Sequence, residues 1–178
     1  MDALVQFGVT GAIGPVRCDA LLGEVAAELG APEDLGWVSK RRRWPHRFGY
    51  GDLELCVCRC RRVLSFEVQT WRGVIDLPPL GRDAGSELVR HSGRISSAEL
   101  TAALSVAGCA VVEETASVPG QMTLRALGGR VAFVFSMDHQ HGAVLECAGA
   151  YYGTGHACPP IVPGTPEDGF GLGEITGP

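Results

Sequence analysis

The chain has 178 residues, of which 46% are hydrophobic and 20% charged, and its formal net charge is −5. This length is enough to bury a core as one domain or as two fused half-domains, and the composition is ordinary for a soluble globular protein. No apolar run approaches the length of a membrane-spanning helix, which argues against a helical membrane protein. The first residues lack the basic start and apolar stretch of a secretory signal, so we expect a cytoplasmic protein.

In chain order, residues 3–7 have the pattern of a short strand. Apolar residues at helical spacing then predict a helix over residues 22–29, ended by Gly30 and Pro32. Residues 53–60 and 63–71 alternate between apolar and polar side chains and predict a half-buried antiparallel hairpin, with Arg61 and Arg62 as its turn.

The same pattern then recurs. Ser96 and Glu99 form a capping-box pair that opens a second helix, and strands are predicted near residues 109–114, 121–127, 131–135 and 143–148. The matching segments are 22–30 and 100–108, 51–57 and 129–135, and 66–68 and 145–147. Their offset is 78 for the first two pairs and 79 for the third.

We therefore predict an α+β fold of two similar halves, each one helix followed by antiparallel strands, that arose by internal duplication. The halves are residues 1–77 and 96–152, with a connector at 78–95 and a flexible Gly/Pro-rich tail at 153–178. Whether the halves form one sheet or two stays open. The expected core residues are Leu22, Leu29, Leu55, Val57, Phe66, Val68, Leu104, Phe133, Phe135 and Leu145.

The seven cysteines fit a reducing compartment, where they serve as small hydrophobic residues. Three of them alternate along one predicted strand, as Cys56, Cys58 and Cys60. Alternate strand residues lie about 6.6–7 Å apart, too far for three in a row to bind one ion without a kink. A second group lies in predicted loops: Asp138, His139, His141, His156 and Cys158. We expect structural, metal-free cysteines and no cofactor.

Catalytic motifs do not stand out. The glycines of residues 8–14 contain no G-x-G and are followed by Pro15, so they do not predict a dinucleotide site. None of the five histidines or seven cysteines lies in a recognised nucleophile context. The sequence favours a protein that is not an enzyme, with an unrecognised hydrolase as one alternative.

Positive charge is concentrated between residues 40 and 72, where nine basic and three acidic residues give a local balance of +6 and leave −11 for the remainder. Such segregation predicts two electrostatic faces, although a solvated edge without a ligand explains it equally well. Interface energy concentrates in Arg and Trp, which selects five partner-binding candidates: Arg41, Arg42, Arg43, Trp44 and Trp71. Arginines interleaved with aromatic residues also suit single-stranded nucleic acid, but the acidic whole opposes phosphates.

Three short motifs carry a family resemblance. Residues 50–55 read Y-G-D-L-E-L, residues 29–32 read L-G-A-P, and residues 75–78 read I-D-L-P. Over residues 22–150 the chain resembles a group of small, uncharacterised actinobacterial proteins in which an L-G-x-P helix end precedes a Y-G-D-L-E-L strand. In size and layout these proteins are similar to the immunity proteins of polymorphic toxin systems. The resemblance implies a cytoplasmic antitoxin that covers the active site of a toxin or effector protein. A nucleic-acid-binding accessory protein is the alternative, and the oligomeric state stays open.

Overall fold

The computed structural model describes residues 1–79, 88–114, 118–138, 142–151 and 156–159. In these segments the helices are α1 (Asp2–Thr10), α2 (Leu22–Leu29) and α3 (Ser97–Val106). The strands are β1 (Ala12–Ile13), β2 (Val16–Arg17), β3 (Glu33–Ser39), β4 (Arg42–Tyr50), β5 (Leu53–Val57), β6 (Val63–Gln69), β7 (Val74–Leu77), β8 (Val89–Ser92), β9 (Val111–Glu114), β10 (Gln121–Ala126), β11 (Val131–Asp138) and β12 (Gly142–Tyr151). The fold is therefore mixed α+β. No described helix is long and apolar enough to cross a membrane.

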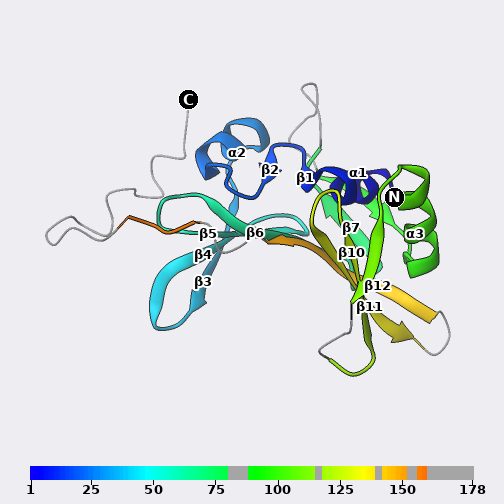
Figure 1. Cartoon of the computed structure of the whole chain (residues 1–178). Coiled ribbons are helices and arrows are strands. Elements are labelled where there is room, and N and C mark those ends of the chain that lie inside the picture. Colours follow the sequence, from blue (N-terminus) through cyan, green and yellow to red (C-terminus); the bar gives the residue numbers. More distant parts are fainter. Residues whose placement is uncertain (80–87, 115–117, 139–141, 152–155, 160–178) are drawn as a thin grey trace, which may run out of the picture.

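The strands β3 to β6 and β9 to β12 form one antiparallel sheet in the order β3-β4-β5-β6-β12-β11-β10-β9 (Figure 1). Each helix α2 or α3 is followed by a four-stranded meander, and the two meanders join where β6 pairs with β12. The sequence left open whether the two halves form one sheet or two. The pairing of β6 with β12 joins their meanders into one sheet. Strands β3 and β9 are the two edges of the sheet.

Two short hairpins lie outside this sheet, β1 with β2 and β7 with β8. Strand β8 lies in the stretch predicted as a connector, residues 78–95, and its pairing with β7 folds part of that stretch back onto the first half. The predicted tail, residues 153–178, lies outside the described residues except for 156–159.

Alternation of side chains builds the core, as predicted. In β5, Leu53, Leu55 and Val57 are buried while Glu54 and Cys56 are half-exposed. Of the ten expected core residues nine are buried, and Leu29 is half-buried.

The predicted turn at Arg61 and Arg62 would place Val57 opposite Phe66, but the register of the β5–β6 hairpin is different. Leu55 pairs with Phe66, because β5 ends at Val57 and the turn extends from Cys58 to Arg62. The predicted strand over residues 53–60 is therefore three residues too long.

All three helices lie on the same side of the sheet (Figure 1). The predicted capping box opens α3: the Glu99 N–H donates to Ser96 Oγ at 3.3 Å, and the Ser96 N–H donates to the Glu99 carboxylate at 3.0 Å. Helix α2 buries Leu22 and Val25, and α3 buries Leu100 and Leu104.

The strand predicted over residues 3–7 is wrong, because this segment belongs to helix α1. Leu4, Phe7 and Gly8 share its buried face at helical spacing. The Phe7 ring lies 5.1 Å from the ring of Phe66 in β6 and 6.5 Å from that of Phe133 in β11. Helix α1 therefore seals the core across the junction of the two meanders, a role that its own sequence pattern does not reveal.

Candidate functional site

The hairpin of β3 and β4 carries four of the five candidate residues, Arg41, Arg42, Arg43 and Trp44, at one edge of the sheet. Ser39 pairs with Arg42 across it, so Lys40 and Arg41 form its tip. Arg41, Arg42 and Arg43 are all exposed. We call this segment, residues 33–50, the basic hairpin.

Two exposed apolar residues of the basic hairpin escaped the sequence analysis. Trp37 is 56% exposed and Val38 is 52% exposed, both on edge strand β3. Nothing in the local sequence pattern shows that residues 37 and 38 lie on an edge strand. An edge strand leaves one row of backbone N–H and C=O groups without a partner strand.

Trp44, in contrast, is engaged within the fold. It is half-buried and packs against the core cluster. The Arg61 guanidinium lies over its ring, 4.7 Å from the centroid, in a cation–π contact that joins the basic hairpin to the β5–β6 turn. Burial, and secondly the charge of Arg43, lower the pKa of Arg61. Trp44 thus anchors the hairpin.

A second contact braces the two strands of the hairpin against each other. His46 is buried, and its Nε2 lies 2.6 Å from Asp34 Oδ1. The hydrogen bond to His46 lowers the pKa of Asp34, against a smaller opposing effect of desolvation. The His46 ring also lies 5.0 Å from the ring of Phe48. The hairpin is therefore held at its base by packed and hydrogen-bonded side chains, while its tip carries the charge.

Trp71 does not belong to this surface. It is 67% exposed, but it follows the end of β6 remote from the β5–β6 turn. At about 3.3 Å per residue, β6 separates Trp71 from that turn by about 20 Å. Trp71 instead borders a shallow hollow with Gly73, Arg94 and Glu146.

Several arginines of the basic stretch have internal partners. Arg62 donates to the Asp19 backbone oxygen at 2.9 Å and to its carboxylate at 3.2 Å. Arg72 forms an ion pair with buried Asp52. The positive charge predicted for residues 40–72 is thus partly used inside the fold, and its exposed part lies mainly on the basic hairpin.

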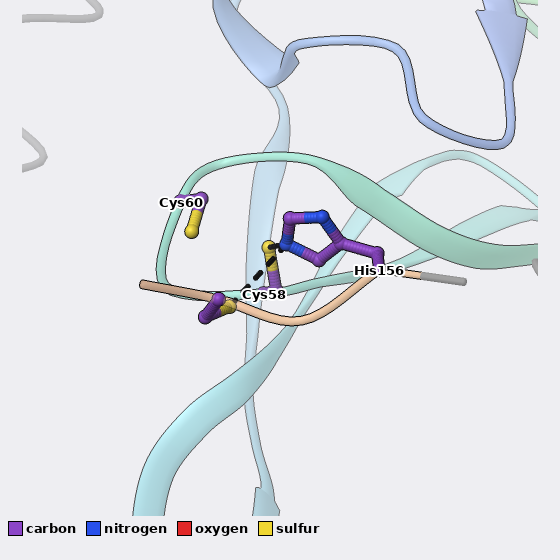
Figure 2. A group of neighbouring side chains, drawn as sticks. Cys58, Cys60 and His156 are labelled. Carbon is purple, nitrogen blue, oxygen red and sulfur yellow. Dashed lines mark hydrogen bonds between the residues drawn. The ribbon is translucent and has the colours of Figure 1, made fainter. Parts of the chain in front are cut away.

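The β5–β6 turn brings together residues from the two groups of Cys and His residues that were considered as metal ligands and expected to be metal-free. Cys58 and Cys60 come from the turn, and His156 and Cys158 come from the segment that lies beside it (Figure 1). Their Sγ and imidazole nitrogen atoms all lie within 4.8 Å of one another. We call these four residues the thiol–imidazole cluster. Figure 2 shows the His156 ring directed at the Cys58 sulfur, with Cys60 on the adjoining turn.

Within this cluster the His156 Nε2 lies 3.4 Å from the sulfur of Cys58 and 3.4 Å from that of Cys158. Burial raises the pKa of Cys58, and it raises that of Cys60 to about 12. Burial also acts to raise the pKa of Cys158, but hydrogen bonds from Cys60, His156 and Cys58 outweigh it and bring that pKa to about 6. The surroundings of Cys158 therefore favour its thiolate.

Among the described side chains, no other member of the two candidate groups joins the cluster. Cys56 stays on β5, opposite Ser65, and outside the cluster. His139 and His141 lie outside the described residues, as does the Asp138 side chain. The cluster therefore takes Cys58 and Cys60, without Cys56, from the strand group and His156 and Cys158 from the loop group.

The Y-G-D-L-E-L motif serves the fold. The Tyr50 hydroxyl donates to the Gly30 carbonyl at 3.0 Å, which links the motif to the end of α2, and burial raises the pKa of Tyr50 to about 12. Asp52 accepts from the Asp76 N–H at 2.7 Å, and Gly51, at φ +64°, would place a Cβ only 2.4 Å from the Asp76 carbonyl oxygen. All three parts of the resemblance therefore meet at one structural junction.

No protein-family model matches the chain, and neither the comparison with curated proteins nor that with solved structures returned a match.

Proposed function

We propose that the chain is a cytoplasmic, non-enzymatic protein-binding module that docks its basic hairpin against an acidic surface of a partner protein. The observation that carries the proposal is the exposure of Arg41, Arg42 and Arg43 next to exposed Trp37 on a braced edge hairpin. Arg and Trp dominate the energy of protein interfaces, and a rigid platform loses little entropy on docking. Charge complementarity then guides the encounter.

The partner class that we propose is a toxin or effector whose active site the chain covers, as in an immunity protein. Such inhibition requires only complementary shape and charge, so no catalytic group is needed. The resemblance of residues 50–55 to small actinobacterial proteins supports this choice. A toxin gene beside the gene for this chain would support it independently.

The nucleic-acid alternative rests on the same hairpin, because an exposed Trp37 could stack on a base while arginines bind phosphates. Two observations weigh against it. The second aromatic candidate of the hairpin, Trp44, is half-buried with Arg61 over its ring, and the chain as a whole carries −5. We therefore favour a protein partner.

We also propose that the two helix-plus-meander units arose by duplication. The sequence offset of 78 maps the start of β5 at Leu53 onto the start of β11 at Val131. Each is the third strand counted from its own edge of the sheet. Similarly, α2 maps onto α3, and each helix precedes its meander.

The test is capture of partners from the native host with the untagged wild type, an Arg42→Glu/Arg43→Glu variant and a Trp37→Ala variant. Arg17→Glu/Arg130→Glu is the matched control, because Arg17 and Arg130 are also exposed but lie on β2 and in the β10–β11 turn. The captured protein is then purified and titrated. We expect at least about a tenfold weaker Kd for each hairpin variant, and a control within about threefold of the wild type.

Melting temperatures are measured in parallel, and exposed charge reversals should leave them nearly unchanged. Equal binding by the wild type and the hairpin variants would exclude this surface. A single-stranded oligonucleotide is titrated against the same variants. If the oligonucleotide binds and the hairpin variants lose it, while no protein depends on the hairpin, the nucleic-acid alternative replaces our proposal.

A further inference from the structure

The thiol–imidazole cluster joins two places in the chain that are far apart in sequence. His156 lies 98 residues beyond Cys58, yet the two side chains are 3.4 Å apart. Cys58 is buried and the other three members are half-buried, so the group lies partly below the surface. Three sulfurs and one imidazole nitrogen within 4.8 Å are the donor set of a structural zinc site.

We propose that Cys58, Cys60, His156 and Cys158 bind one Zn²⁺ ion in a tetrahedral site. With zinc–sulfur bonds of about 2.3 Å and a zinc–nitrogen bond of about 2.0–2.1 Å, tetrahedral geometry places sulfur and nitrogen about 3.6 Å apart. The two sulfur–nitrogen distances here are both 3.4 Å. The ligands therefore need only small movements to close on an ion.

The local backbone explains how a C-x-C pair can bind one ion. A regular strand would place Cys58 and Cys60 about 6.6–7 Å apart. Strand β5 ends at Val57, however, and the chain turns: the Cys58 N–H donates to the Arg62 carbonyl at 2.9 Å, and the Arg61 N–H donates to the Cys58 carbonyl at 2.9 Å. Arg61 completes the turn at φ +61°. The sequence-based expectation of metal-free thiols assumed a regular strand over these residues. The turn provides the kink that allows Cys58 and Cys60 to approach one ion.

Four protein ligands leave no open position, which is the pattern of structural rather than catalytic zinc. Thiolate and imidazole donors select zinc over magnesium or calcium, which prefer oxygen. Bound zinc would fasten residues 156–159 to the β5–β6 turn and would fix the turn that carries Arg61. Because Arg61 covers Trp44, the ion would also steady the basic hairpin. The zinc site itself does not depend on the proposed partner.

The test is metal analysis of the full-length, untagged chain, purified without chelator under reducing conditions from zinc-supplemented medium. We expect one zinc per chain in the wild type, and loss of nearly all of it after dialysis of Cys158→Ser and His156→Ala. The matched control is Cys56→Ser, which removes a half-buried thiol from the neighbouring strand position outside the cluster and should retain the metal. The Arg42→Glu/Arg43→Glu variant should also retain it, which separates this test from that of partner binding.

A folding defect in a ligand variant is handled by a second measurement on the wild type. X-ray absorption at the zinc edge should show three sulfur neighbours at about 2.3 Å and one nitrogen at about 2.0–2.1 Å. Sub-stoichiometric zinc in folded, reduced wild type would overturn the proposal, as would zinc that Cys56→Ser loses or that Cys158→Ser keeps. A chain that contains no zinc and whose intact mass is two hydrogens below that of the reduced form would contain a disulfide instead. This result would also overturn the proposal.

Discussion

β3 and β9 occupy the two edges of the sheet, and each begins a four-stranded meander behind its own helix. The segments at these two edges differ in charge. The β3–β4 hairpin exposes Arg41, Arg42 and Arg43, whereas β9 ends in exposed Glu113 and half-exposed Glu114. The strand order places the two edges at equivalent positions in the sheet, and their exposed side chains give them different charges. In the proposed function, the scaffold supplies the exposed edge at which a partner docks, and the arginines select an acidic partner.

The two halves also differ in the elements that pack against the β4–β5 turn and the β10–β11 turn. Gly51 precedes β5, and a Cβ there would lie 2.4 Å from the Asp76 carbonyl oxygen of β7. Gly129, the residue 78 positions later, is pressed against the backbone of Gly11, whose nitrogen would lie 2.2 Å from such a Cβ. Equivalent turns thus receive different additional elements, the β7–β8 hairpin in one half and the end of α1 in the other.

The largest expected effect compares Phe66 with Leu145, which the offset of 79 makes equivalent. Both are 1% exposed. We expect Phe66→Ala to lower the free energy of unfolding by about 3–5 kcal/mol and Leu145→Ala by about 2–5 kcal/mol, because each leaves a cavity. Phe66 should cost more, since it also contacts Phe7 of α1. Urea denaturation measures both, and a loss below about 1 kcal/mol for Phe66→Ala would contradict the assigned core.

An intermediate effect is expected at the two turn glycines. Gly51→Ala imposes a side chain at φ +64° as well as a backbone clash, and Gly129→Ala imposes a clash alone. We expect each to lower stability by about 1–3 kcal/mol. Gly23→Ala is the control, because it lies in α2 with nothing within 4 Å of its Cβ, and it should raise stability by about 0.5–1 kcal/mol. A Gly51→Ala variant as stable as the wild type would contradict the close packing of Gly51 against the Asp76 carbonyl oxygen.

The smallest effect concerns acid titration at the two edges. The pKa of Asp34 is lowered mainly by its hydrogen bond to His46, and that of Glu114 is lowered mainly by its hydrogen bond to Arg125. A carboxyl whose pKa is depressed on folding contributes stability above its unfolded pKa and loses it as the pH falls through the folded pKa. Both contributions should therefore be present at neutral pH and disappear below about pH 4, and both should be small because these side chains are exposed.

Acid unfolding of Asp34→Asn and Glu114→Gln, compared with the wild type, checks this expectation. Each variant should lower stability slightly at neutral pH, and its curve should approach that of the wild type toward acid. A difference that instead grows as the pH falls would contradict the assigned pairings.

Local patterns predicted much of the frame because the signals and their causes lie close together in sequence. Alternation placed Leu55 and Val57 in the core, and the Ser96 and Glu99 pair placed the start of α3. The same reasoning misassigned α1. Its short apolar pattern fits either a strand or a helix, and what settles the matter is the position of Phe7 between Phe66 and Phe133, which come from distant strands.

The candidate sites show the same division. The sequence indicated Arg41, Arg42 and Arg43 as exposed basic residues, since a run of three arginines has no local apolar face. It could not show that Trp71 lies at the opposite end of β6, that Trp44 is half-buried beneath Arg61, or that Trp37 is exposed on an edge. Those facts depend on strand order and register, which are set by pairing between segments.

By itself, then, the sequence determined the α+β class, the alternating core and the basic stretch, because each follows from residue spacing within a single element. Only the tertiary structure joined the two meanders through β6 and β12, and only the tertiary structure brought Cys58 and Cys60 to His156 and Cys158. Contacts across 98 residues arise from the packing of the whole chain, and no local period encodes them.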